Sequence, residues 1–347
     1  MRALPWFQAL FMAAVLAFPL AFMPASMPAH AAQPPVAGAQ SVIDALTKAN
    51  GAVVGIRVVA ADGARSAETL GKQRSGSGVV IGPDTVLTIG YLMLEAESIQ
   101  VVTQDNRTLP AKAVAYDLAT GFGIVKPLLP LRGVTPVALG SHGALEAGEP
   151  LMAATGGEDG DVAMTRLVSK RPFSGYWEYH IESALFTSPP IGNHSGAPLF
   201  NQRGELLGIG SLFVMDAMGD SRRLPGNMFV PVDLLKPILA EMQQTGTTKH
   251  SRRPWLGLTS SEQGGRVQIV RVNRESPAQV AGLQPGDFVL AVDGAKVATL
   301  EDFYKKLWEH TNPEDEIKLT VLQGADVKVI TLKGVDRMST MIKPAGI

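Results

Sequence analysis

A serine lies in a short segment of small residues, where its hydroxyl could act as a nucleophile. Residues 193–199 read NHSGAPL, so Ser195 precedes a glycine, an alanine and a proline. A serine hydroxyl attacks poorly unless an adjacent base takes its proton. His194 is next to it in sequence, but neighbouring side chains in a turning loop usually point apart, so we expect no direct bond from the imidazole to the hydroxyl. Without another base, Ser195 is a small turn residue.

The other histidines do not offer an obvious replacement for that base. The chain has six, at His30, His142, His180, His194, His250 and His310. The first of them falls in a predicted signal peptide, so the mature chain has none before His142. Their spacing is not that of metal ligands, and the absence of cysteine excludes disulfides and thiolate metal sites. We therefore expect neither a metal nor a cofactor.

Several segments on both sides of Ser195 follow one another in an order that is typical of a protease family. They are residues 76–81 (GSGVVI), 86–88 (VLT), 117–126 (DLATGFGIVK) and 227–239 (NMFVPVDLLKPIL). Together they resemble the HtrA-type (DegP-like) serine proteases over nearly all of the chain after residue 40. The resemblance implies a mainly β fold that contains a trypsin-like double β-barrel, with two six-stranded barrels meeting near residues 135–145.

The resemblance also implies that the catalytic positions are altered. Ser195 takes the place of the nucleophile, whereas Tyr91 stands at the position of the catalytic histidine and Gly121 at that of the triad aspartate. Asn193 replaces a glycine of the oxyanion loop. A tyrosine, with a pKa of about 10, donates rather than accepts a proton near neutral pH. We therefore predict a catalytically degenerate member, a pseudoprotease; the alternative is an active serine endopeptidase that uses Ser195 with a non-standard base.

The most specific match lies near the C-terminus. Residues 255–258 (WLGL) and 276–294 (SPAQVAGLQPGDFVLAVDG) resemble the PDZ domain of the same family, which completes the fold class as a double β-barrel followed by an α+β PDZ domain. In such a loop, consecutive backbone N–H groups bind a terminal carboxylate, and the adjoining strand edge pairs with an extended peptide. Two aromatic residues, four apart on a helix after Thr299, could line the peptide groove or serve only as packing residues. The predicted peptide-binding residues are Trp255, Leu256, Gly257, Leu258, Tyr304 and Trp308.

The N-terminus has the pattern of a secretory signal peptide. Arg2 precedes an apolar run over residues 7–22, and small residues at Ala29 and Ala31 favour cleavage after Ala31. The run is shorter than the ~20 residues that span a bilayer, so an uncleaved membrane anchor is the weaker alternative. We therefore expect a periplasmic protein.

The remaining pattern predicts the domain boundaries. Short β-branched runs between turn residues favour barrels or sandwiches, residues 42–49 read as a short amphipathic helix, and a polar segment with Gly246 reads as a linker. The C-terminal tail is expected to be unstructured. The predicted divisions are a signal peptide (1–31), a flexible leader (32–40), a protease-like domain (41–244), a linker (245–251), a PDZ domain (252–335) and a tail (336–347).

Charge and resemblance together suggest the partners. The net charge is −1, and no basic run is interleaved with aromatic residues, which argues against nucleic acid binding. We expect binding to the C-termini of unfolded or envelope proteins, as part of envelope protein quality control. The resemblance suggests a homotrimer, or a hetero-oligomer with an active relative. Membrane contact is expected only if the signal peptide is retained as an anchor.

Overall fold

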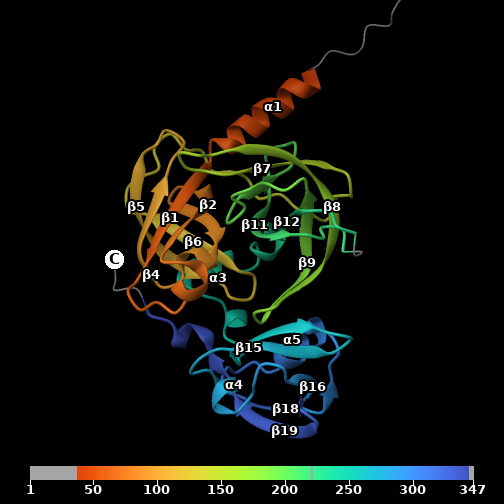
Figure 1. Cartoon of the computed structure of the whole chain (residues 1–347). Helices are drawn as coiled ribbons and strands as arrows, with labels where there is room; N and C mark the ends of the chain where they lie inside the picture. The colour runs from red at the N-terminus through yellow and green to blue at the C-terminus, as the bar shows by residue number, and fades with distance from the viewer. Residues whose placement is uncertain (1–36, 220–221, 344–347) are drawn as a thin grey trace, which may run out of the picture. The chain divides into compact units, whose positions relative to one another are not determined.

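The computed structural model describes residues 37–219 and 222–343 of the 347-residue chain (Figure 1). The predicted signal peptide lies outside the described residues. The helix expected over residues 42–49 runs from Ala37 to Asn50 (α1), so residues 37–40 of the predicted leader are helical rather than flexible. From Ala39 onward the chain forms one compact unit. None of the described helices is long and apolar enough to span a membrane.

Six strands close the first barrel, in the order β1-β2-β3-β6-β5-β4 (orange to yellow in Figure 1). Its apolar side chains meet inside, among them Ile56, Leu87 and Ile124, and burying them stabilises the barrel. A short helical turn, η1 (Gly90–Met93), follows β3 and carries Tyr91. The strands are β1 (Val53–Ala60), β2 (Gln73–Gly82), β3 (Thr85–Ile89), β4 (Ala96–Val102), β5 (Thr108–Tyr116) and β6 (Phe122–Pro127), with α2 (Ala67–Leu70) between the first two.

Six further strands close the second barrel, in the order β10-β11-β12-β9-β8-β7 (green in Figure 1). Two of them, β8 and β9, pair up to Gly175 opposite Tyr179, so residues 176–178 form the turn at the end of a long hairpin. The two six-stranded barrels predicted from the sequence are thus confirmed. The strands are β7 (Pro150–Ala154), β8 (Val162–Gly175), β9 (Tyr179–Ser188), β10 (Pro198–Phe200), β11 (Leu206–Val214) and β12 (Gly226–Pro231).

A buried carboxylate fixes the connection that leaves the second barrel. After η2 (Val232–Leu234) and α3 (Leu239–Thr245), Gly246 ends the helix in a left-handed conformation, as its sequence position predicts. The next turn, η3 (Lys249–Ser251), lies against the first barrel. There Asp117 accepts hydrogen bonds from the hydroxyls of Thr248 (2.6 Å) and Ser251 (2.5 Å). The predicted linker is therefore packed against the first barrel.

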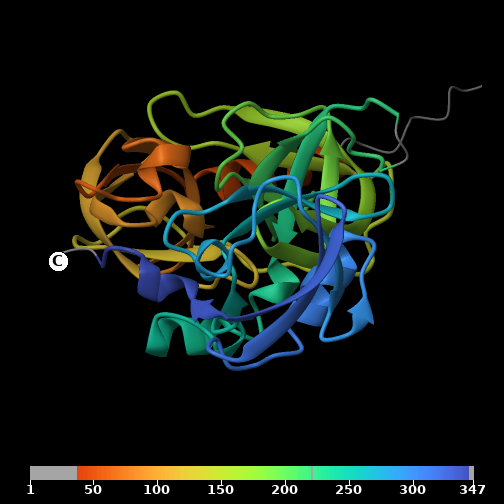
Figure 2. The ribbon, with the colours of Figure 1, turned by 60° about the horizontal axis from the view of Figure 1, so that its bottom comes forward.

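The C-terminal part is a six-stranded sheet in the order β14-β15-β16-β18-β19, with β17 paired to β16, and it carries two helices; its blue elements come forward in Figure 2. The longer helix, α5 (Leu300–Leu307), follows Thr299, which caps it and forms a capping box with Asp302. The side chains of Leu300, Phe303 and Leu307 in α5 are buried in the core of this part. The other elements are β13 (Pro254–Trp255), β14 (Leu258–Glu262), β15 (Val267–Val272), α4 (Pro277–Val280), β16 (Phe288–Val292), β17 (Ala295–Lys296), β18 (Glu316–Gln323) and β19 (Asp326–Lys333).

The expectation of an unstructured tail is wrong for residues 336–343. Strand β20 (Val335–Asp336) pairs with β13, and a short helical turn, η4 (Arg337–Thr340), follows it. Beyond this turn, the backbone N–H of Ile342 donates to the carboxylate of Glu95, 2.9 Å away. Because Glu95 also accepts from the backbone N–H of Ser66 (2.7 Å), one carboxylate ties the tail to the first barrel. Residues 344–347 lie outside the described part of the chain.

Candidate functional site

The loop that carries Ser195 is pressed between the two barrels. The N–H of Ser77 in β2 donates to the carbonyl of Ser195 (2.8 Å), and the N–H of Gly196 donates to the carbonyl of Gly210 in β11 (2.8 Å). Gly196 has φ +75°, and a Cβ there would lie 2.0 Å from the carbonyl oxygen of Ser77. Only glycine fits this close approach. The loop therefore presents Ser195 at the junction of the barrels.

Tyr91 contacts the hydroxyl of Ser195 directly. Its Oη lies 2.7 Å from Ser195 Oγ and 2.9 Å from the carbonyl oxygen of Ser211, to which only a donor can bond. Burial raises the pKa of Tyr91 to about 12. At neutral pH the phenol keeps its proton, so the group in hydrogen-bond contact with Ser195 is poorly suited to act as its base.

Gly121, at the predicted aspartate position, offers no carboxylate and little space for one. Its φ is +86°, a conformation that favours glycine, and its carbonyl accepts from the N–H of Gly90 (2.7 Å). A Cβ at this residue would lie 3.2 Å from the hydroxyl oxygen of Tyr179 and 3.4 Å from a methyl carbon of Ile89. The place is therefore occupied by neighbouring side chains.

Asn193 and His194 do not supply the missing groups. Asn193 is exposed, and the N–H of His194 donates to the carbonyl of Gly192 (2.7 Å), which the imidazole Nδ1 also approaches at 3.0 Å. Burial lowers the pKa of His194. Within residues 37–219 and 222–343, no histidine ring forms a hydrogen bond with the Ser195 hydroxyl.

The predicted carboxylate-binding loop turns tightly at Gly257. Gly257 has φ +83°, and a Cβ there would lie 2.2 Å from Cβ of Ser276, so the loop requires glycine. Leu256 is fully buried and anchors the loop in the core. Three successive N–H groups, those of Leu256, Gly257 and Leu258, converge on one point.

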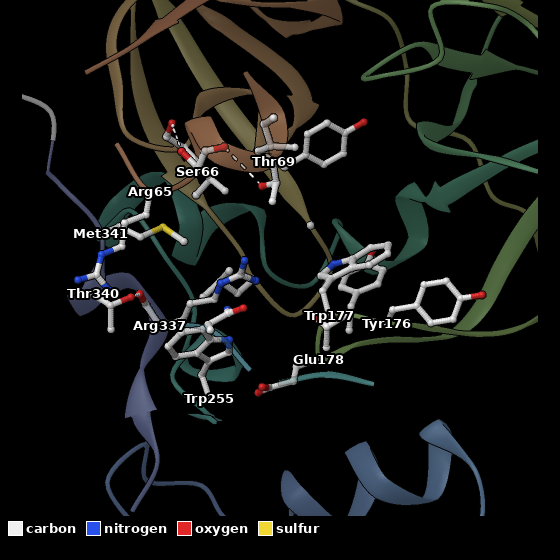
Figure 3. Close-up of a pocket in the computed structure, with 18 of the residues that line it drawn as sticks. Arg65, Ser66, Thr69, Tyr176, Trp177, Glu178, Trp255, Arg337, Thr340 and Met341 are labelled. Carbon is white, nitrogen blue, oxygen red and sulfur yellow. Dashed lines mark hydrogen bonds between the residues drawn. The ribbon is translucent and has the colours of Figure 1, made fainter. Parts of the chain in front are cut away.

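A carboxylate already occupies that point. Glu178, in the turn between β8 and β9, accepts from the N–H groups of Leu256 (3.0 Å), Gly257 (2.8 Å) and Leu258 (2.8 Å). Figure 3 shows its carboxylate directed towards the segment that carries Trp255. Burial raises the pKa of Glu178, and the three N–H groups oppose this rise. Sequence reasoning missed this residue, because nothing in the turn's own sequence indicates a partner in another domain.

Of the two predicted aromatic residues, Tyr304 of α5 packs, and Trp308, just after this helix, lines the site. Tyr304 is fully buried; its hydroxyl donates to the carbonyl of Gly175 (2.7 Å) and accepts from the N–H of Glu178 (3.2 Å). Its ring stacks on Trp308 with centroids 5.2 Å apart. The guanidinium carbon of Arg253 lies 3.3 Å from the centroid of the Trp308 ring, and burial lowers the pKa of Arg253 to about 10. Tyr304 is therefore a packing residue whose hydroxyl contacts the turn between β8 and β9, whereas Trp308 lines the site.

A cavity of about 940 Å³ connects these features. Its lining includes Tyr91 and Ser195 at the barrel junction, and Trp177, Trp255 and Trp308 nearer the C-terminal part. Aromatic and aliphatic side chains supply much of the wall, which suits apolar side chains of a peptide, and charged residues, among them five arginines, line the rest.

One cluster of possible metal-binding groups is already neutralised. Donor atoms of His180, Glu182 and Glu301 lie within 4.8 Å of one another. However, the ammonium of Lys305 lies 3.0 Å from Glu182 and 2.6 Å from Glu301, and therefore supplies the cation. We assign no metal to this cluster.

Comparisons with protein families agree with this geometry. The family of trypsin-like peptidase domains matches residues 76–209, and the family of PDZ domains matches residues 254–333. The fold predicted from the sequence, a trypsin-like barrel domain followed by a PDZ domain, is thus confirmed.

Comparisons with individual proteins point the same way. A probable periplasmic serine endoprotease, DegP-like, from Hahella chejuensis is 27% identical over 273 residues, which cover 73% of this chain and 55% of the relative. The putative serine protease HhoA from Synechocystis is 26% identical over 276 residues, covering 72% of this chain and 67% of the relative. The chain thus spans just over half the length of the DegP-like relative.

Solved structures share the fold. The HtrA-type protease AlgW with a tripeptide superposes with a TM-score of 0.52 at 20% identity, covering 85% of this chain and 96% of AlgW. A serine endoprotease from Yersinia pestis gives a TM-score of 0.52 at 20% identity, with 85% of this chain and 97% of the other covered.

Proposed function

We propose that this HtrA/DegP-like chain, a trypsin-like peptidase domain followed by a PDZ domain, is a pseudoprotease that binds peptides without hydrolysing them. The observation that carries the proposal is the contact between Tyr91 and Ser195. A phenol with a pKa of about 12 lies 2.7 Å from the hydroxyl, where a base is needed. The position of the orienting carboxylate holds Gly121 instead.

The size of the loss supports a non-catalytic role. Removing the members of a serine triad costs on the order of 10⁶ in kcat, and the remaining ~10³ to 10⁴ over water comes from the oxyanion hole and binding. That remainder also needs an oxyanion hole, and at Asn193 the glycine expected in that loop is absent. Turnover at this level is too slow for protein degradation.

The PDZ domain supplies the proposed activity. Its loop directs the N–H groups of Leu256, Gly257 and Leu258 at a carboxylate, the group that ends every polypeptide. One structural relative, AlgW, was solved with a tripeptide. We therefore propose that the partners are the C-termini of unfolded or envelope proteins.

The compartment and assembly belong to the same proposal. Relatives are named periplasmic, which supports export through the signal peptide at residues 1–31 and a role in envelope protein quality control. We propose assembly as a homotrimer or with an active relative, and only an active relative would bring a peptide held by the PDZ domain to a functional protease. The proposed divisions remain 41–244, 245–251 and 252–335.

Covalent labelling and hydrolysis assays test the loss of chemistry. The mature protein is incubated with a fluorophosphonate probe and with denatured casein, beside Ser195→Ala and an active HtrA-type protease as a positive control. We expect no labelling of Ser195 and equal, background hydrolysis by the wild type and Ser195→Ala. Steady casein turnover that disappears in Ser195→Ala would instead establish an active endopeptidase.

A further inference from the structure

The carboxylate-binding loop of the PDZ domain is filled by the protein's own Glu178. All three N–H groups that would hold a peptide's terminal carboxylate donate to this side chain, at 2.8 to 3.0 Å. Glu178 is only 6% exposed and has φ +57°, an uncommon conformation for a residue other than glycine. Such strain persists only where surrounding contacts hold it. Here those contacts are the loop itself.

The same turn also occupies the strand edge beside the loop. Strand β14 lies at the edge of the PDZ sheet, and the N–H of its Ser260 donates to the carbonyl of Tyr176 (2.8 Å). From the opposite side of the groove, the hydroxyl of Tyr304 in α5 donates to the carbonyl of Gly175 (2.7 Å). The turn therefore uses the two features that a PDZ domain offers to an extended peptide, the carboxylate nest and the strand edge.

We propose that residues 175–178 are a built-in ligand of the PDZ groove, and that an external peptide with a free C-terminal carboxylate binds by displacing them. This inference rests on the proposed peptide-binding function and adds how that binding is controlled. The side-chain carboxylate of Glu178 and a terminal carboxylate have the same charge and the same acceptor atoms, so one excludes the other. An external peptide therefore binds the groove only if its terminal carboxylate replaces that of Glu178.

Tethering sets the strength of this competition. A ligand held on the same chain acts at an effective concentration of the order of millimolar. A groove that is closed nine-tenths of the time shows an apparent affinity for external peptide about tenfold weaker than the open groove. Weakly binding chain ends are therefore rejected, and only tightly binding or abundant ones open the site.

Displacement of the turn reaches the barrel junction through one neighbouring residue. Tyr179 follows Glu178 directly, stacks on Trp177 with ring centroids 5.8 Å apart, and donates its hydroxyl to the carbonyl of Thr120 (2.6 Å). Trp177 lines the same cavity as Ser195, and in Figure 3 its side chain leaves the turn in a different direction from that of Glu178. Peptide capture thus rearranges the wall of that cavity.

The test compares Glu178→Ala with the wild-type mature protein. Glu158→Ala is the matched control, because Glu158 is an exposed glutamate of the same barrel that pairs with Arg57. The first readout is amide hydrogen exchange at residues 256–260, which needs no peptide. The second is fluorescence anisotropy with fluorescein-labelled hexapeptides whose last three positions are randomised over apolar residues, with a free or an amidated C-terminus.

We expect exchange at residues 256–260 to be faster in Glu178→Ala, and the free-acid peptides to bind at least about tenfold more tightly than to the wild type. The amidated peptides should bind no more tightly to Glu178→Ala than to the wild type. Glu158→Ala should match the wild type in both exchange and affinity. Tyr304→Phe serves as a second variant that retains the packing ring; it should shift both readouts in the same direction by a smaller factor.

Two results would distinguish a failure of the built-in ligand from a failure of the proposed peptide-binding function. Unchanged exchange and unchanged affinity in folded Glu178→Ala and Tyr304→Phe would overturn the built-in ligand. Faster exchange in Glu178→Ala, with no free-acid peptide bound by any variant, would support the built-in ligand and overturn the proposed peptide-binding function.

Discussion

Tyr179 donates its hydroxyl proton to the carbonyl of Thr120, 2.6 Å away, and thereby fills the space beside Gly121. In the related proteases this is the place of the residue that orients the catalytic histidine, as the sequence resemblance implies. The tyrosine that fills it belongs to the same hairpin whose turn carries Glu178. The side chain that fills the changed catalytic position and the carboxylate that fills the PDZ loop therefore come from consecutive residues, Tyr179 at the start of β9 and Glu178 in the turn before it.

We predict that a side chain at residue 121 destabilises the protein. Gly121→Ala and Gly121→Asp should each lower the free energy of unfolding by about 1 to 3 kcal/mol, because φ is +86° and Tyr179 and Ile89 lie close. Gly133→Ala is the control, since Gly133 also has positive φ (+79°) but nothing lies within 4 Å of its added Cβ. Urea unfolding should show a larger loss at residue 121. Equal losses at both glycines would show that the contacts at Gly121 do not matter.

A second prediction concerns Tyr91. Tyr91→Phe should lower the stability by about 1 to 2 kcal/mol, because the carbonyl of Ser211 and the hydroxyl of Ser195 lose a partner. It should leave casein hydrolysis at background. Tyr116→Phe is the control, because no hydrogen bond of the Tyr116 hydroxyl is found among the described residues. If Tyr91→Phe reduced a measurable hydrolysis by the wild type, the phenol would have to take part in catalysis.

Asp117 should be a strong determinant of how the linker is held. It is buried and accepts from Thr248, Ser251 and the backbone and hydroxyl of Thr120. Asp117→Asn turns one acceptor into a donor that faces donors, so we expect a loss of about 3 kcal/mol and faster proteolysis near residues 245–253. Asp62→Asn, which removes an exposed pair with Lys72, should lower the stability far less, because solvent screens that pair. Comparable stability of Asp117→Asn and Asp62→Asn in urea would contradict the role of Asp117 in holding the linker.

His310 should contribute to the stability of the PDZ domain in a pH-dependent way. Its Nε2 lies 2.7 Å from Asp293 and its Nδ1 lies 3.4 Å from Asp315, and the bond to Asp293 raises the pKa of His310 above 6.5. A raised pKa of a cationic group stabilises the folded state below the unfolded pKa, and this stabilisation is lost as pH rises through the folded pKa. His310→Gln should therefore lower the melting temperature more at pH 5.5 than at pH 9. Equal losses of melting temperature at the two pH values would contradict this contribution.

The sequence predicted the fold well, because its signals are local. Short β-branched runs between turn residues favoured barrels or sandwiches, the family resemblance implied the two barrels, and the capping residue Thr299 predicted the start of α5. The resemblance also predicted that Tyr91 stands near Ser195, which the distance of 2.7 Å agrees with. Its consequence for catalysis, however, stays a prediction until activity is measured.

The features that the sequence did not predict depend on distant residues. Glu178 finds its partners 78 to 80 residues further along the chain, and its own turn reads as an ordinary surface hairpin. The tail at residues 336–343 is held by Glu95, 247 residues before Ile342. Local composition favoured a flexible segment there, because a hydrogen bond from a backbone N–H to a carboxylate far away in the sequence leaves no short-range pattern.

The three tryptophans of the described residues give this protein a natural optical reporter. Trp177, Trp255 and Trp308 all line one cavity, and the fourth tryptophan of the sequence, Trp6, falls within the predicted signal peptide. After cleavage, the whole indole emission therefore comes from this one region. Tyr179 stacks on one of these rings and Arg253 lies over another, so both emitters sense their immediate surroundings. A shift in the emission maximum on adding a peptide would reveal opening of the groove in unlabelled protein.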